Sequence, residues 1–139
     1  MDGSAKAKQI GRDRMTNALV DTEEFDESRF KALLELAGPS TARTLTIQLQ
    51  EDLALVAEAL TEARSSTDHQ VFRKQSHVLL GISGTIGATR LYQLSERLND
   101  LARGQGGGAL GDLLAEIFAA LDRLLARIRS AHALLLAVP

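Results

Sequence analysis

The chain contains no cysteine, and only 4% of its residues are aromatic. The lack of cysteine excludes disulfide bonds, thiolate chemistry and metal sites with cysteine ligands. No uncharged apolar run reaches the length of a membrane-spanning helix, and the N-terminus has no apolar core typical of a signal peptide. We therefore expect a cytoplasmic protein without a membrane segment.

A strong positive charge is also missing. The formal net charge is -2, and no basic block with interleaved aromatic residues occurs. Nucleic-acid binding usually needs an electropositive surface that attracts phosphates. We therefore expect no nucleic-acid partner.

Residues that favour helices dominate the composition. Leucine, alanine, arginine, glutamate and glutamine are frequent, and β-branched residues never form an alternating run. The 139 residues suffice to bury one core without help from a metal or disulfides. These features predict an all-α protein with one globular domain at 25–135 and a mobile N-terminal tail at 1–24.

Apolar residues recur at helical spacing within that domain. A short helix is predicted from about residue 26 to Gly38-Pro39, and a longer one from Ser40 or Thr41 to about Arg64. A third begins at Thr67 or Asp68 and weakens at Gly87, where it forms a hairpin or a bend with a fourth helix ending near Arg103. A glycine-rich connection at 104–108 precedes the last helix. Short connections favour antiparallel neighbours, so we expect an antiparallel up-down four-helix bundle with an additional short N-terminal helix.

The stretch 74–88 contains the most informative residue, His77. At about 100° per residue, Phe72, Leu79 and Ile86 fall on one side of a helix and His77 points the opposite way. The histidine is therefore predicted to face solvent.

Two glycines, Gly81 and Gly84, share the outward side with His77. Each costs a helix about 0.8–1 kcal/mol relative to alanine, so a large partner is expected to approach the imidazole closely. Arg73 and Lys74 lie one turn before the histidine, and an exposed Leu80 is expected at the edge of this face. The alternative is a solvated surface histidine beside glycines that admit helix packing.

The other motifs in the sequence give little indication of function. The string Gly106-x-Gly108-x-x-Gly111 matches a dinucleotide fingerprint but lacks the preceding strand that this motif requires. His69 and His132 stand in no spacing typical of a metal site, so no metal is expected. His132 is interpreted as a histidine that favours the dipole at the end of the last helix.

The spacing His77-x-Leu79-x-Gly81-x-Ser83-x-x-Ile86-Gly87-Ala88, followed by Leu91, Leu94 and Leu98, resembles the signature of histidine-containing phosphotransfer (HPt) domains over about residues 26–134. The resemblance implies a four-helix bundle in which the outer nitrogen of His77 carries a phosphoryl group. It also implies receiver domains of response regulators or hybrid histidine kinases as partners. The divalent metal would belong to the receiver, so this chain needs no cofactor.

The same resemblance places Asn99 and Arg103, near the end of the next helix, close to the active histidine. The chain differs from the family in having Leu80 where a lysine is common. Arg73, Lys74 or Arg103 are candidates to replace that charge, because charge-assisted bonds to phosphate oxygens are strong. A solvated helix face and a polar helix end remain the alternative interpretations of these residues.

These observations favour a phosphorelay intermediate in two-component signal transduction. Imidazole suits the task because it is nucleophilic at neutral pH, with an unperturbed pKa of about 6.5. The chain has no recognisable nucleotide motif, so a histidine kinase or another enzyme is not expected. The alternative function is a non-phosphorylated helical adaptor that binds a partner protein through an apolar patch.

Overall fold

The computed structural model describes residues 24–66, 68–104 and 109–137 of the chain. In this part of the chain the regular elements are all helices, which confirms the predicted all-α class. They are α2 (Glu27–Ala37), α3 (Pro39–Ser66), α4 (His69–Ile86), α5 (Thr89–Ala102) and α6 (Leu110–Ala137). The predicted tail at 1–24 lies outside the described residues apart from Glu24, and so does most of the predicted connection at 104–108.

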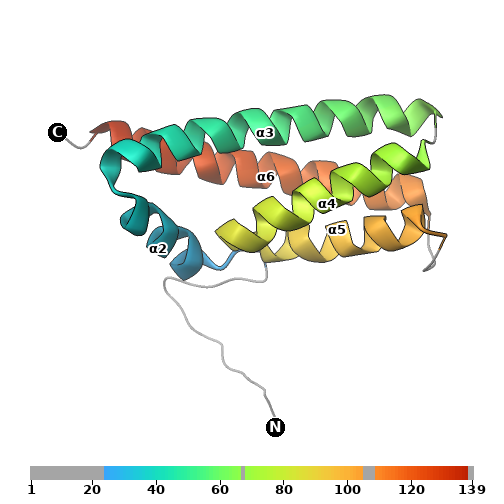
Figure 1. Cartoon of the computed structure of the whole chain (residues 1–139), viewed down its shortest axis with the longest axis horizontal. Helices are drawn as coiled ribbons and strands as arrows, with labels where there is room; N and C mark the ends of the chain where they lie inside the picture. The colour runs from blue at the N-terminus through green and yellow to red at the C-terminus, as the bar shows by residue number, and fades with distance from the viewer. Residues whose placement is uncertain (1–23, 67, 105–108, 138–139) are drawn as a thin grey trace, which may run out of the picture.

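The helices pack side by side as a bundle (Figure 1). α3 contacts α4 and α6, and α5 contacts the same two helices, so each of these four has two neighbours among them. The short α2 lies at one end, where it contacts α3 and α4. In this arrangement the apolar stripes of the four helices can all be buried together.

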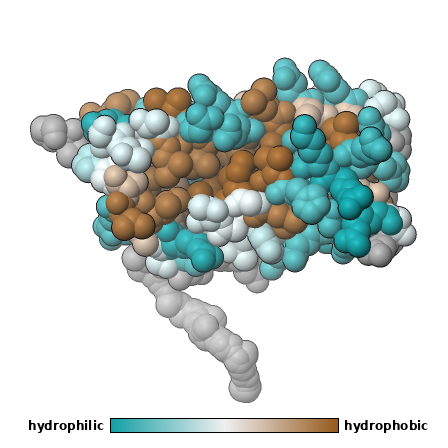
Figure 2. All heavy atoms as spheres, in the orientation of Figure 1, coloured by the Kyte–Doolittle hydropathy of each residue, from teal (hydrophilic) through white to brown (hydrophobic). Residues whose placement is uncertain are grey.

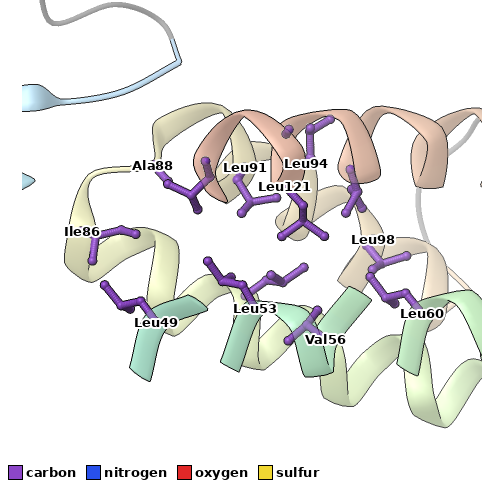
Figure 3. Close-up of a cluster of buried hydrophobic side chains, with 14 of the residues drawn as sticks. Leu49, Leu53, Val56, Leu60, Ile86, Ala88, Leu91, Leu94, Leu98 and Leu121 are labelled. Atoms are coloured by element: carbon purple, nitrogen blue, oxygen red, sulfur yellow. The ribbon is translucent and has the colours of Figure 1, made fainter. Parts of the chain in front are cut away.

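Leucine fills most of the core between the helices. Figure 3 shows side chains from α3, α5 and α6 meeting at its centre, among them Leu53, Leu91 and Leu121, each at most 1% exposed. Truncating such a side chain to alanine typically costs about 2–5 kcal/mol. Apolar burial of this extent decides which side of each helix points inward.

Aspartates mark the starts of α2 and α4. Oδ1 of Asp26 accepts the backbone N–H of Arg29 at 3.1 Å, and Oδ1 of Asp68 accepts that of Gln70 at 3.1 Å. Such side chains satisfy N–H groups that have no partner within the first turn of a helix. Of the two residues predicted to cap the third helix, Asp68 is therefore the cap.

A sharp corner at Gly38 separates α2 from α3. Gly38 has φ 82°, and its carbonyl accepts the N–H of Ala42 at 2.8 Å. α3 then begins at Pro39, just before the residues predicted to start it. Proline suits this first position because its missing N–H would have no partner in the helix.

A hairpin at Gly87 joins α4 to α5, which decides between the hairpin and the bend that the sequence allowed. Gly87 has φ 78° and ψ 28°, a left-handed conformation that suits glycine, and its N–H donates to the carbonyl of Ser83. Its own carbonyl accepts the N–H of Asp26 at 2.7 Å. The turn therefore also holds the start of α2.

Ion pairs connect the same region to α6. Arg127 pairs with Glu27 at 2.6 Å, and Arg123 pairs with Glu24 at 3.1 Å. The guanidinium of Arg127 also lies 5.0 Å from the ring centroid of Phe30. The chain before and within α2 is thus held against both the α4–α5 hairpin and α6.

The substitution Gly87→Ala should lower the free energy of unfolding by about 2–4 kcal/mol, because a strained left-handed backbone and a steric clash add together. A Cβ at this position would lie 2.7 Å from the carbonyl oxygen of Asp26. Gly104→Ala is the matched control, since Gly104 also has φ 78° but its Cβ would meet nothing within 4 Å. Urea denaturation measures both losses, and equal losses would show that the contact with Asp26 is unimportant.

Candidate functional site

The two sides of α4 have different environments. Phe72, Leu79 and Ile86 are buried in the core, whereas His77 is exposed. Arg73 and Lys74, one turn earlier, are exposed as well. The structure therefore brings the histidine and both cations to one outer surface of α4, as the helical spacing indicates.

The glycines on this surface have different surroundings. A Cβ on Gly81 would meet nothing within 4 Å, so the space beside His77 is open at this position. Gly84 is half-buried, and a Cβ there would lie 3.4 Å from Cε2 of Tyr92 on α5. The small Gly84 therefore allows the ring of Tyr92 to pack against α4. The sequence predicted that Gly84 faces outward and gave no indication of this contact. Of the two glycines, Gly81 is the one with open space beside it.

Leu80 is half-buried rather than exposed as expected. It lies in a shallow groove between α4 and α5 that is also lined by Gln93, Glu96, Arg97, Asn99 and Asp100. The expectation of an exposed Leu80 was wrong because α5 covers part of this side chain. The spacing of apolar residues within α4 does not show which side of α4 the neighbouring helix covers. The groove presents two carboxylates, two amides and a guanidinium around one apolar side chain.

Asn99 is half-buried at the boundary between α4 and α5. Its Oδ1 lies 3.4 Å from the hydroxyl oxygen of Ser76, the buried residue that precedes the histidine. Arg103 is exposed just after α5, one turn beyond Asn99, where its backbone N–H donates to the carbonyls of Asn99 and Asp100. The structure thus brings Asn99 to the strip of α4 next to His77, while Arg103 lies farther along α5.

Four residues of this surface were not predicted from the sequence: Ser76, Tyr92, Glu96 and Asp100. The spacing of Glu96, Asn99 and Arg103, three and four residues apart, places these three on one side of a helix and could have indicated a polar strip on α5. Ser76 and Tyr92 carry no such signal. Their roles depend on which residues of the neighbouring helix they face.

Arg73 and Lys74 form no ion pair with any residue in the described ranges, in contrast to Arg90, which pairs with Glu116 at 2.8 Å. Their charges are therefore not neutralised within this part of the structure. An exposed imidazole with two uncompensated cations one turn away can accept an anionic group, since both cations can offer charge-assisted hydrogen bonds to it.

The other two histidines are in different situations. Nδ1 of His132 lies 2.7 Å from the hydroxyl oxygen of the buried Thr46, so this ring joins α6 to α3. The sequence indicated only that His132 would favour the helix dipole. It did not predict the contact with Thr46, because Thr46 lies far away in the sequence, on α3. His69 is exposed at the start of α4, with its ring centroid 6.3 Å from that of Phe72.

The described residues contain neither a metal-binding cluster nor a membrane-spanning helix. Within these ranges, no three histidine, aspartate or glutamate side chains gather closely enough to hold a metal ion. None of the described helices combines the length and the apolar character needed to cross a membrane.

Comparisons with known proteins identify no relative. No protein-family model matches the chain, and neither the curated proteins nor the solved structures contain a significant match.

The different surroundings of the two glycines can be tested by one substitution at two positions. Gly84→Leu should be less stable than Gly81→Leu by about 1–3 kcal/mol, because overpacking must displace Tyr92 only at position 84. Both sites are in the interior of the same helix, so the gain in helix propensity is the same. Urea denaturation compares the two variants, and equal stabilities would contradict the packing role of Gly84.

Proposed function

We propose that the chain is a phosphorelay intermediate similar to HPt proteins. His77 accepts a phosphoryl group from the aspartyl phosphate of one receiver domain and passes it to the aspartate of another. The observation that carries this proposal is the exposed His77 beside Gly81, where a Cβ would meet nothing within 4 Å. A receiver must bring its aspartate within bonding distance of the imidazole, and a side chain at position 81 would obstruct that approach.

Each transfer is a substitution at phosphorus. The imidazole nitrogen forms a P–N bond while the P–O bond of the acyl phosphate breaks, and the aspartate carboxylate leaves. In the second transfer a carboxylate oxygen of another receiver attacks, and the imidazole leaves. The receiver supplies the divalent metal ion for both steps, so this chain contributes a nucleophile and a docking surface.

The proposal includes an antiparallel up-down arrangement of α3 to α6, with α2 as an additional short helix. The two-residue link at Gly87–Ala88 supports it, because connections this short favour antiparallel neighbours. The pairwise contacts of the four helices and their course in Figure 1 are consistent with this topology.

HPt domains commonly have a lysine where this chain has Leu80. In this proposal, Arg73 and Lys74, one turn before the histidine, supply the positive charge instead. Leu80 lies in the groove with α5 and cannot neutralise a phosphoryl group. Arg73 and Lys74 are exposed on the same side of α4 as His77 and unpaired within the described residues. Asn99 adds a neutral donor, and Arg103 is a more distant source of charge.

A non-phosphorylated helical adaptor is the second candidate, and exposed apolar side chains favour it. Val78 is 37% exposed and Tyr92 is 38% exposed, although large apolar residues are usually buried. Figure 2 shows apolar residues gathered across the middle of one face of the molecule. Such a patch serves either function, because a receiver also needs an apolar docking surface. Only labelling at His77 separates the two.

His77→Gln should remain folded, because the side chain is exposed, and should accept no phosphoryl group, because the nucleophilic imidazole is removed. The measurement is acid-labile labelling after mixing with a phosphorylated receiver, with circular dichroism to verify the fold. His69→Gln is the matched control, since it removes another exposed histidine of the same helix. Labelling of the His77 variant at the parental level, or labelling of the parent by ATP alone, would contradict the proposal.

The double variant Arg73→Ala, Lys74→Ala should shorten the lifetime of phosphohistidine or slow its formation. We expect a change of roughly three- to ten-fold, which corresponds to the loss of a charge-assisted hydrogen bond in a solvated setting. Lys31→Ala, Arg129→Ala removes the same charge from exposed positions on α2 and α6 and should leave both rates unchanged. Equal behaviour of the two double variants would show that Arg73 and Lys74 belong only to a solvated surface.

A further inference from the structure

Leu80, the residue in which the chain differs from the HPt pattern, lies directly beside the candidate nucleophile. It follows His77 by three residues, and side chains at this spacing on a helix are neighbours, with about 5–6 Å between their Cβ atoms. On the other side of the histidine, a Cβ on Gly81 would meet nothing within 4 Å. A protein that docks on His77 therefore also covers Leu80.

The side chain of Leu80 is apolar, whereas its neighbours on α5 are polar. Leu80 is half-buried in a shallow groove, and the other residues that line this groove are Gln93, Glu96, Arg97, Asn99 and Asp100. An apolar centre with a polar, solvent-accessible rim is the usual anatomy of a protein–protein interface. The exposed part of Leu80 is therefore a suitable contact for an apolar side chain of a partner.

The rim of this groove has an excess of negative charge. Glu96 and Asp100 are exposed, stand four residues apart on α5, and form no ion pair with another described residue. Like charges at this spacing repel each other and destabilise a helix. The groove sets one guanidinium, that of Arg97, against these two carboxylates. A partner that places a lysine or an arginine over the groove therefore complements its charge.

The charges before and after His77 have opposite signs. Arg73 and Lys74 lie one turn before the histidine, whereas Glu96 and Asp100 line the groove that contains Leu80, one turn after it. A partner docked in the reversed orientation would bring like charges together, which disfavours that orientation. This surface therefore favours one orientation of the partner, with its cationic side chain over the groove.

We propose that Leu80, Glu96 and Asp100 form a receiver-selecting surface. The exposed part of Leu80 contacts an apolar side chain of the receiver, and the two carboxylates bind a lysine or an arginine of the same receiver. This inference rests on the proposed function, because the occupant of the groove is the receiver that exchanges phosphoryl groups with His77. An ammonium group at position 80 would oppose both contacts, since it is charged and repels the cation of the receiver.

The test compares transfer from two phosphoryl donors. A receiver domain phosphorylated with a small acyl phosphate must dock on the surface before transfer, whereas phosphoramidate is too small to need the groove. The receiver that labels the parent fastest is the probe. A residue that selects the receiver should affect the first donor and leave the second unchanged, whereas a residue that only supports the fold should affect both.

Leu80→Ala should lower kcat/KM for transfer from this receiver by about five- to thirty-fold, as expected when contact with about half of a leucine side chain is lost. Labelling by phosphoramidate should be unchanged. Leu125→Ala is the matched control, since Leu125 is also half-buried but lies on α6, whose neighbours in the bundle are α3 and α5. The control should transfer at the parental rate, and circular dichroism verifies the fold of both variants.

Leu80→Lys introduces the residue that is common in the family. It should slow transfer from the receiver at least as much as Leu80→Ala does, because its ammonium repels the cation of the receiver. The half-life of phosphohistidine formed with phosphoramidate should not fall, since an ammonium can bind phosphoryl oxygens. The substitution therefore separates recognition of the receiver from stabilisation of the phosphoryl group.

The double variant Glu96→Gln, Asp100→Asn should remain folded, because both side chains are exposed. At low salt it should lower kcat/KM for the receiver by about two- to ten-fold, as expected for exposed ion pairs, and the difference should shrink as salt is added. Glu51→Gln, Glu58→Gln removes the same charge from exposed positions on α3 and should match the parent.

Three results would overturn the inference while the proposed function stands. They are transfer from the receiver to Leu80→Lys at the parental rate, equal slowing of both donors by Leu80→Ala, and equal behaviour of the two double variants. A parent that takes no label at His77 from either donor would overturn the proposed function and this inference together.

Discussion

Burial of the apolar stripes is the interaction on which the rest of the structure depends. Successive residues of a helix turn by about 100°, so α4 can bury Phe72, Leu79 and Ile86 in only one rotation about its axis. That rotation places His77 in solvent and Ser76 against α5. The position of the candidate nucleophile is therefore a consequence of core packing, since its side chain makes no hydrogen bond or ion pair with another described residue.

The hairpin at Gly87 places α5 beside α4, so the surface around the histidine is formed by residues of both helices. A turn of two residues leaves little freedom in the register of α5 against α4, and so it decides which residues of α5 lie beside the histidine. In that register Tyr92 lies over Gly84, and Asn99 lies beside Ser76. The same turn holds the start of α2 through Asp26. One glycine thus links the end of the bundle to the layout of the candidate site.

The arginines divide into two groups by their partners. Arg90, Arg123 and Arg127 pair with Glu116, Glu24 and Glu27, respectively. Arg73, like Lys74 beside it, has no such partner within the described ranges. Positive charge remains available on the side of α4 that carries His77, although the whole chain has a formal net charge of -2. The local distribution of charge therefore matters more for this surface than the net value.

The sequence by itself determined the helical class, most helix boundaries and the outward direction of His77, because these depend on residues within a few turns of each other. The tertiary structure decided the features that involve two helices. They include the half-buried place of Leu80, the packing of Tyr92 on Gly84 and the contacts of Ser76 and His132. Each depends on which sides of two helices meet and in what register. The spacing within one helix contains no information about either, because its period describes only the rotation about its own axis.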